Sequence, residues 1–109
     1  MVATHNLNTV ELSPNTGYVA GEVLFVDGSR LMFFEFLRRR VSSLDRGKYR
    51  YHYMDIYDQL IFRYDNAPHH PTVATFPQHK HTPTGIVASA TPDFAMVLAE
   101  AEQVVLGLP

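Results

Sequence analysis

The sequence predicts an α+β fold, in which an antiparallel sheet of about four strands in two hairpins is covered on one face by a C-terminal helix. Two observations support this prediction: β-rich runs joined by short turn sequences occupy residues 18–64, and the C-terminal segment has apolar residues at helical spacing. A chain of 109 residues, 46% hydrophobic and 18% charged, is expected to form a single domain over residues 1–109. Residues 1–16 are expected to be either flexible or dependent on a partner for their structure.

The first predicted hairpin joins residues 18–25 to residues 30–37. Both runs, YVAGEVLF and RLMFFEFL, are rich in β-branched and aromatic residues. Asp27 and Gly28 lie between them, and Asp-Gly is one of the strongest signals for a two-residue hairpin turn.

The second predicted hairpin joins residues 48–55 to residues 60–64. A turn centred on Tyr57 and Asp58 would pair opposite residues, and opposed residues share a face of the sheet. The predicted pairs are Tyr53 with Phe62, His52 with Arg63, Tyr51 with Tyr64, and Arg50 with Asp65. One face is then aromatic and suited to the core, whereas the other is polar. A shift of one residue would destroy this separation, which favours the register.

Residues 66–90 are predicted to form a long, ordered Pro/His-rich loop. Four prolines rule out a continuous helix and make a central strand unfavourable. They are Pro68, Pro71, Pro77 and Pro83. A helix is then expected to begin with Thr91 as its cap and Pro92 at its first position. Its predicted apolar stripe consists of Phe94, Val97, Leu98, Ala101, Val104 and Val105.

Composition excludes some classes of protein. The chain has no cysteine, so disulfides and thiolate metal sites are excluded. No apolar run approaches the roughly 20 residues that span a bilayer, and the N-terminus does not resemble a signal peptide, so we expect a cytoplasmic protein without membrane contact. Residues 30–63 contain eight of the nine Lys and Arg residues but only four of the eleven Asp and Glu residues. Such a basic patch can bind phosphates although the whole chain has a net charge of -2.

Histidines are concentrated in residues 52–81, which contain five of the six. Imidazole gives or takes a proton near neutral pH because its unperturbed pKa is about 6.5. Together with the polar face of the second hairpin, these groups have the chemistry to cleave RNA without a metal or other cofactor. We predict that His52 transfers a proton and that Arg50 and Arg63 stabilise the phosphate. Asp65 would orient His52 or act as the second proton-transfer group.

The remaining polar residues of this region are predicted to bind substrate. They are Lys48, His69, His70, His79, Lys80 and His81. Tyr49, Tyr51 and Tyr53 are candidates for stacking on bases, although alternating tyrosines in a strand more often belong to the core.

Two other interpretations of the histidines stay open. His69, His70, His79 and His81 could bind a metal ion, because imidazole is a common ligand of transition metals, although their spacing is not that of a helical zinc site. Loop histidines can also be structural, with rings that pack on prolines and nitrogens that bond the backbone. A noncatalytic module that binds a metal or another protein is therefore the alternative function.

The runs YHYMD, LIFRYDNAPHHP and FPQHKH, preceded by DGSRL and FEF, resemble a prokaryotic family that includes the TumE-type toxins of toxin–antitoxin modules. The resemblance covers residues 17–106. It implies a small α+β protein that inhibits growth by attacking RNA, and a cognate antitoxin encoded beside it. A helix-turn-helix protein is one candidate for that antitoxin. A homodimer is also compatible with this interpretation. Gln78 stands where a further histidine is common, and the segment before Tyr18 is short for a family that often begins with a helix.

Overall fold

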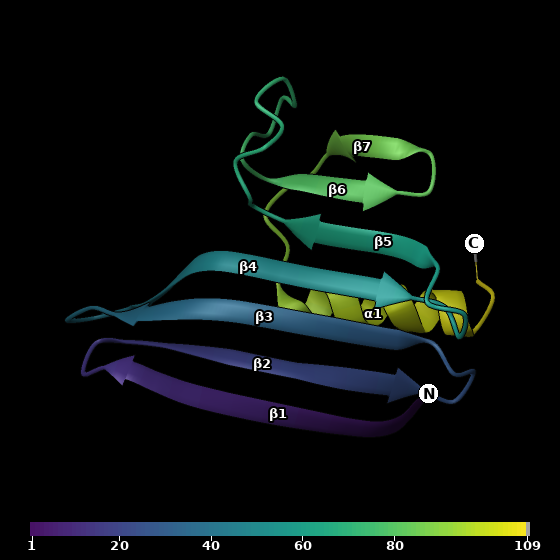
Figure 1. Ribbon diagram of the computed structural model, residues 1–109, viewed down its shortest axis with the longest axis horizontal. Helices are drawn as coiled ribbons and strands as arrows, with labels where there is room; N and C mark the ends of the chain where they lie inside the picture. Colours follow the sequence, from purple (N-terminus) through teal and green to yellow (C-terminus); the bar gives the residue numbers. More distant parts are fainter. Residues whose placement is uncertain (109) are drawn as a thin grey trace.

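A computed structural model describes residues 1–108 as seven β-strands followed by one α-helix. The strands are β1 (Val2–Ser13), β2 (Thr16–Phe25), β3 (Arg30–Arg39), β4 (Leu44–Met54), β5 (Leu60–Asp65), β6 (His79–Thr82) and β7 (Gly85–Ala88). Each strand pairs antiparallel with the next, so the sheet is a meander in the order β1 to β7. Helix α1 (Phe94–Val105) lies behind the central strands, against one face of the sheet (Figure 1).

The α+β class is confirmed, but the predicted number of four strands is too low. The four predicted strands are β2 to β5, at the centre of the sheet. Strand β1 adds an edge, because residues 2–13 pair along almost the whole of β2. Strands β6 and β7 form within the segment that was predicted to be a loop. The prolines do not prevent this, since Pro77 precedes β6 and Pro83 lies in the turn between β6 and β7.

The predicted register of the second hairpin is confirmed at all four pairs, from Arg50 with Asp65 to Tyr53 with Phe62. A bulge follows, because Met54 pairs with Leu60. The aromatic face of the hairpin points to the core, where Tyr51 and Tyr53 are fully buried. Tyr49 is 2% exposed, so the idea that Tyr49, Tyr51 and Tyr53 stack on bases is wrong.

Helix α1 begins two residues later than the sequence predicted. Asp93, not Thr91, is the cap: its backbone is extended and its carboxylate accepts a hydrogen bond of 2.8 Å from the amide of Met96. Val97 and Ala101 are buried against the sheet, and the Phe94 ring lies 4.8 Å from that of Phe33 on β3. The predicted apolar stripe therefore faces the core, except for Val104, which is exposed.

The opposite face of the sheet is not covered by the helix (Figure 1), and we call it the open face. Two rows of side chains cross it, because residues that pair across neighbouring strands point the same way. The first row is Met32, His52, Arg63 and His81, and the second is Phe34, Arg50, Asp65 and His79. Within residues 1–108 no helix is long and apolar enough to cross a membrane.

Candidate functional site

Arg63 on β5 lies between two histidines on the open face. It pairs with His52 on β4 and with His81 on β6. Neighbouring strands are about 4.8 Å apart, so the two imidazoles extend from backbones roughly 10 Å apart, with Arg63 on the strand between them. The sequence predicted the His52–Arg63 pair but not the position of His81, because β6 was assigned to a loop.

Asp65 is the centre of the polar contacts in the neighbouring row. The residue is 4% exposed. Its carboxylate accepts hydrogen bonds from Nε of Arg63 at 2.9 Å and from the backbone amide of Ala67 at 3.0 Å. The same carboxylate lies 2.9 Å from Nε2 of His79 and 3.4 Å from Nε2 of His81. Asp65 therefore orients Arg63 and the β6 histidines. One of its two predicted roles was to orient His52, and it makes no such contact.

The contacts of His79 determine which of its ring nitrogens donates to the backbone. Its ring is 2% exposed, and its Nδ1 lies 2.9 Å from the carbonyl oxygen of Pro77. A carbonyl can only accept, so Nδ1 carries a proton and donates it. An ionised carboxylate also only accepts, so the contact between Nε2 and Asp65 needs a second proton or a bound cation between them. The Nε2 atom of His79 therefore shares one proton with Asp65 and with Nε2 of His81, or it binds a cation.

Three of the four predicted loop histidines come together beside Asp65. His70, His79 and His81 each offer a ring nitrogen, and these atoms lie within 4.8 Å of one another. The His70 ring packs edge-on against the rings of His79 and His81, with centres 4.9 and 5.6 Å away. His69 is exposed and is not part of this three-histidine cluster.

A pocket of about 430 Å³ opens over these residues, and we call it the histidine pocket. Its lining contains most of the predicted site residues. They are Lys48, Arg50, Arg63, Asp65, His69, His70, His79 and His81, together with Tyr49 and Ala67. His52 does not line the pocket and lies beside it, across from Arg63.

His52 is partly buried, and its Nδ1 atom is buried without a hydrogen-bond partner among the described residues. Burial lowers the pKa of His52, and the nearby charges of Arg63 and Arg50 lower it further. His52 is therefore neutral at pH 7 and can accept a proton.

Asp65, the carboxylate of the site, is ionised at neutral pH. Burial raises the pKa of Asp65, but the hydrogen bonds from Ala67 and Arg63 outweigh burial, so its pKa lies below the usual value. The pKa of His81 lies below its usual value, because burial and the nearby groups His79, Arg63 and His70 lower it more than the Asp65 carboxylate raises it. His81 is more exposed than His79, so it is the imidazole of this pair that solvent can reach.

Lys80 does not join the other predicted substrate-binding residues. Its neighbours in β6 point to the open face, so Lys80 points to the helix face, where its ammonium lies 2.8 Å from Glu100 of α1. The hydroxyl of Tyr64 donates to the same carboxylate at 2.5 Å. The alternation His79-Lys80-His81 was the signal for this arrangement, because in a strand it places both imidazoles on one face and the lysine on the other.

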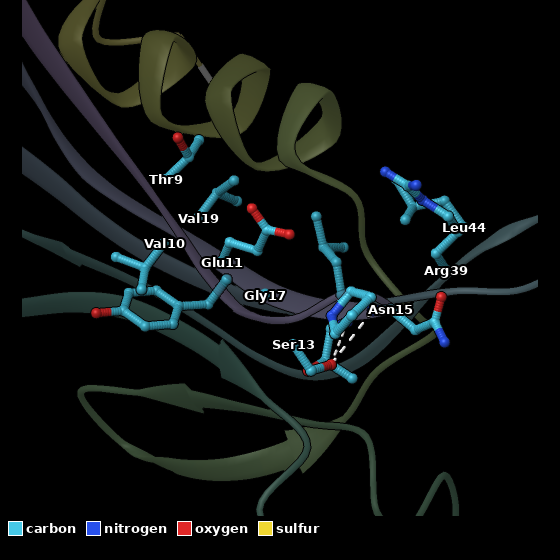
Figure 2. A pocket seen from close by; sticks show the side chains of 13 residues that line it. Thr9, Val10, Glu11, Ser13, Asn15, Gly17, Val19, Arg39 and Leu44 are labelled. Atoms are coloured by element: carbon cyan, nitrogen blue, oxygen red, sulfur yellow. Dashed lines mark hydrogen bonds between the residues drawn. The ribbon is translucent and has the colours of Figure 1, made fainter.

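A second pocket, of about 310 Å³, lies at the end of the β1–β2 hairpin (Figure 2). There the Ser13 hydroxyl accepts hydrogen bonds from the amides of Asn15 and Thr16, at 3.2 and 3.0 Å. This second pocket shares no lining residue with the histidine pocket, and its lining contains no histidine. Its contacts stabilise the hairpin turn.

Comparison with known proteins agrees with the motifs of the histidine region. No curated protein and no solved structure matched the chain. A family model described as Toxin TumE matches residues 1–106, which include β1 and every residue of the histidine pocket. The chain belongs to the TumE toxin family.

Proposed function

We propose that this chain, as a toxin of a toxin–antitoxin pair, cleaves RNA by acid–base catalysis on the open face. Membership of a toxin family suggests the toxin role and implies a cognate antitoxin. The observation that carries the proposed activity is the row in which Arg63 lies between His52 and His81. In-line displacement at a phosphate needs a base on one side, an acid on the other, and positive charge between them.

The residues have distinct roles in this reaction. His52, neutral at pH 7, takes the proton from a ribose 2′-hydroxyl, and the 2′-oxygen forms a bond to phosphorus. The bond from phosphorus to the 5′-oxygen breaks, and His81 gives to that oxygen the proton that it shares with His79 through their Nε2 atoms. The products are a 2′,3′-cyclic phosphate and a 5′-hydroxyl.

Two guanidinium groups support the charge that develops on the phosphate. Arg63 contacts Asp65 through Nε, so its terminal nitrogens take no part in that bond. Arg50 is exposed at the rim of the pocket. Asp65 acts as a positioning residue, since its carboxylate holds Arg63 and contacts Nε2 of His81.

The test uses the purified chain and a 5′-labelled RNA in the presence of EDTA. Cleavage should yield fragments that end in a 2′,3′-cyclic phosphate, and His52→Asn and His81→Asn should each lower the rate by about 100-fold or more, the usual contribution of a general acid or base. His5→Asn, on strand β1, is the matched control and should retain the wild-type rate. Full activity of His52→Asn would refute the assignment of the base.

The metal interpretation remains the second candidate, because the three-histidine cluster and Asp65 present four adjacent ligand groups. Three imidazoles and a carboxylate suit a transition metal such as Zn²⁺. This proposal predicts that chain treated with EDTA and then dialysed binds one Zn²⁺ in a calorimetric titration. His79→Ala combined with His81→Ala should abolish binding, whereas His69→Ala should not. Cleavage in EDTA without zinc binding would select the acid–base proposal.

A further inference from the structure

An aromatic patch on the open face lies next to the histidine pocket. It consists of Tyr18 on β2 with Phe34 and Phe36 on β3, and we call it the aromatic platform. The rings of Tyr18 and Phe34 have centres 5.3 Å apart and planes tilted by 31°. All three residues are partly exposed.

The platform is not needed to fill the core. Phe33, one residue from Phe34, points to the other face and packs on Phe94 of the helix. Phe34 points away from α1, the only helix in residues 1–108. Next to it in the same strand, Met32 is 42% exposed on this face. Clustered exposed apolar side chains of this kind usually mark a binding surface.

The platform is continuous with the proposed phosphate site. Phe34 pairs with Arg50 across β3 and β4, and the guanidinium carbon of Arg50 lies 6.0 Å from the centre of the Phe34 ring. Arg50 also lines the histidine pocket. One arginine therefore joins the aromatic rings to the groups that would act on the phosphate.

Positive charge lies on two sides of the platform, on β4 and at the end of β3. Arg50 and Lys48, both exposed, form no ion pair with any residue of the described chain. Along β3, Arg38 follows Phe36, and the two line a depression together with Arg40, which is paired with Asp45. Flat rings between cationic groups match nucleobases joined by phosphates, since single-stranded nucleic acid is bound by stacking on aromatic side chains and by charge along its backbone. An acidic protein segment would match the charges but would make no use of the rings.

We infer that single-stranded RNA crosses the open face, with a base adjoining the reacting phosphate stacked on Phe34 and Tyr18. This inference rests on the proposed function, because it places the phosphate between His52 and His81. It assigns substrate binding to aromatic residues outside the pocket, and it requires unpaired bases, because a base in a duplex cannot stack on the platform.

The experiment measures binding separately from cleavage. The probe is a fluorescent single-stranded oligoribonucleotide with 2′-O-methyl groups, which lacks the attacking hydroxyl. The full-length double variant Tyr18→Val/Phe34→Val keeps strand-forming residues and should raise the dissociation constant by tenfold or more, as expected for the loss of base stacking. Tyr57→Val, an exposed tyrosine in the β4–β5 turn, is the matched control and should leave it unchanged. Thermal unfolding should show that each variant is folded.

A second readout reports stacking directly. Placed at successive positions of the probe, 2-aminopurine should lose fluorescence at the one or two positions that lie on the platform, and this loss should disappear in the double variant. Unchanged affinity and fluorescence in a folded double variant would overturn the inference. Loss of antitoxin binding with unchanged RNA binding would also overturn it and would assign the platform to the antitoxin. Tight, platform-dependent binding without cleavage of natural RNA would support the inference and refute only the proposed chemistry.

Discussion

His79 and His81 contact each other through their Nε2 atoms, 3.0 Å apart, beside the carboxylate of Asp65. The Pro77 carbonyl holds the proton on Nδ1 of His79, so Nε2 is directed to this contact. The buried ring of His79 thus connects the buried carboxylate of Asp65 to the ring of His81, which is partly exposed to solvent. The Asp65 carboxylate holds both histidines in this arrangement.

Asp65→Asn should lower the free energy of unfolding by roughly 3 kcal/mol, because it leaves Arg63 and His79 without their buried anionic partner. Urea denaturation at pH 7 measures the change. Asp58→Asn is the control: Asp58 is exposed and pairs with Arg30 at the surface, so its loss should cost less than about 1 kcal/mol. Equal effects of the two substitutions would contradict the central role of Asp65.

Stability should fall as the pH is lowered from 7 to 5, in part because of His52. Its pKa is lowered in the folded protein, so between the folded value and the unfolded value of about 6.5 the unfolded chain binds more protons. His81 contributes in the same direction. His52→Gln should therefore reduce the loss of stability between pH 7 and 5, whereas the Asp65 contribution is lost only below about pH 4.

Urea denaturation at both pH values measures this difference, with His5→Gln as the control for loss of a histidine. A pH dependence as steep in His52→Gln as in the wild-type chain would show that His52 does not titrate with a lowered pKa.

Lys80→Gln should leave the rate of RNA cleavage within twofold of wild type, because Lys80 pairs with Glu100 on the helix face. Its effect on stability should stay below about 1 kcal/mol, since both side chains are partly exposed. Arg50→Gln, on the open face, should slow cleavage by at least tenfold. A cleavage assay on the two variants compares the faces directly, and a large loss of activity in Lys80→Gln alone would contradict the assignment of the site to the open face.

The antitoxin is expected to block the open face with an acidic or apolar segment over Arg50, His52 and Arg63. Arg50→Glu should then weaken both toxicity and antitoxin binding, because charge pairing contributes to both. Glu102→Lys on α1 should change neither. Growth assays and the dissociation constant of the purified pair measure the two effects. Loss of toxicity with an unchanged dissociation constant would mean that the antitoxin binds elsewhere.

Local patterns in the sequence were enough to predict the centre of the sheet. The alternation of aromatic and polar residues in residues 50–65 determined the register of β4 and β5, because only one register buries the aromatic residues. The same alternation placed His52 opposite Arg63. The apolar stripe likewise determined which side of the helix packs on the sheet. The sequence placed the helix cap at Thr91, whereas in the structure Asp93 has the extended backbone and the side-chain hydrogen bond of the cap.

Only the tertiary structure decided the rest of the site. The prolines of residues 66–90 favoured a loop in the sequence-based prediction, so β6 was not predicted. This short strand forms by pairing with the edge of β5, and the pairing brings His79 and His81 to Asp65. Strand β1 is likewise stabilised by its pairing with β2 and not by a strong pattern of its own. Contacts between residues distant in the chain depend on which edges and faces the other elements leave available. The sequence by itself therefore determined which polar side chains of β4 and β5 share the open face, while the three-dimensional arrangement placed the histidines of β6 beside them.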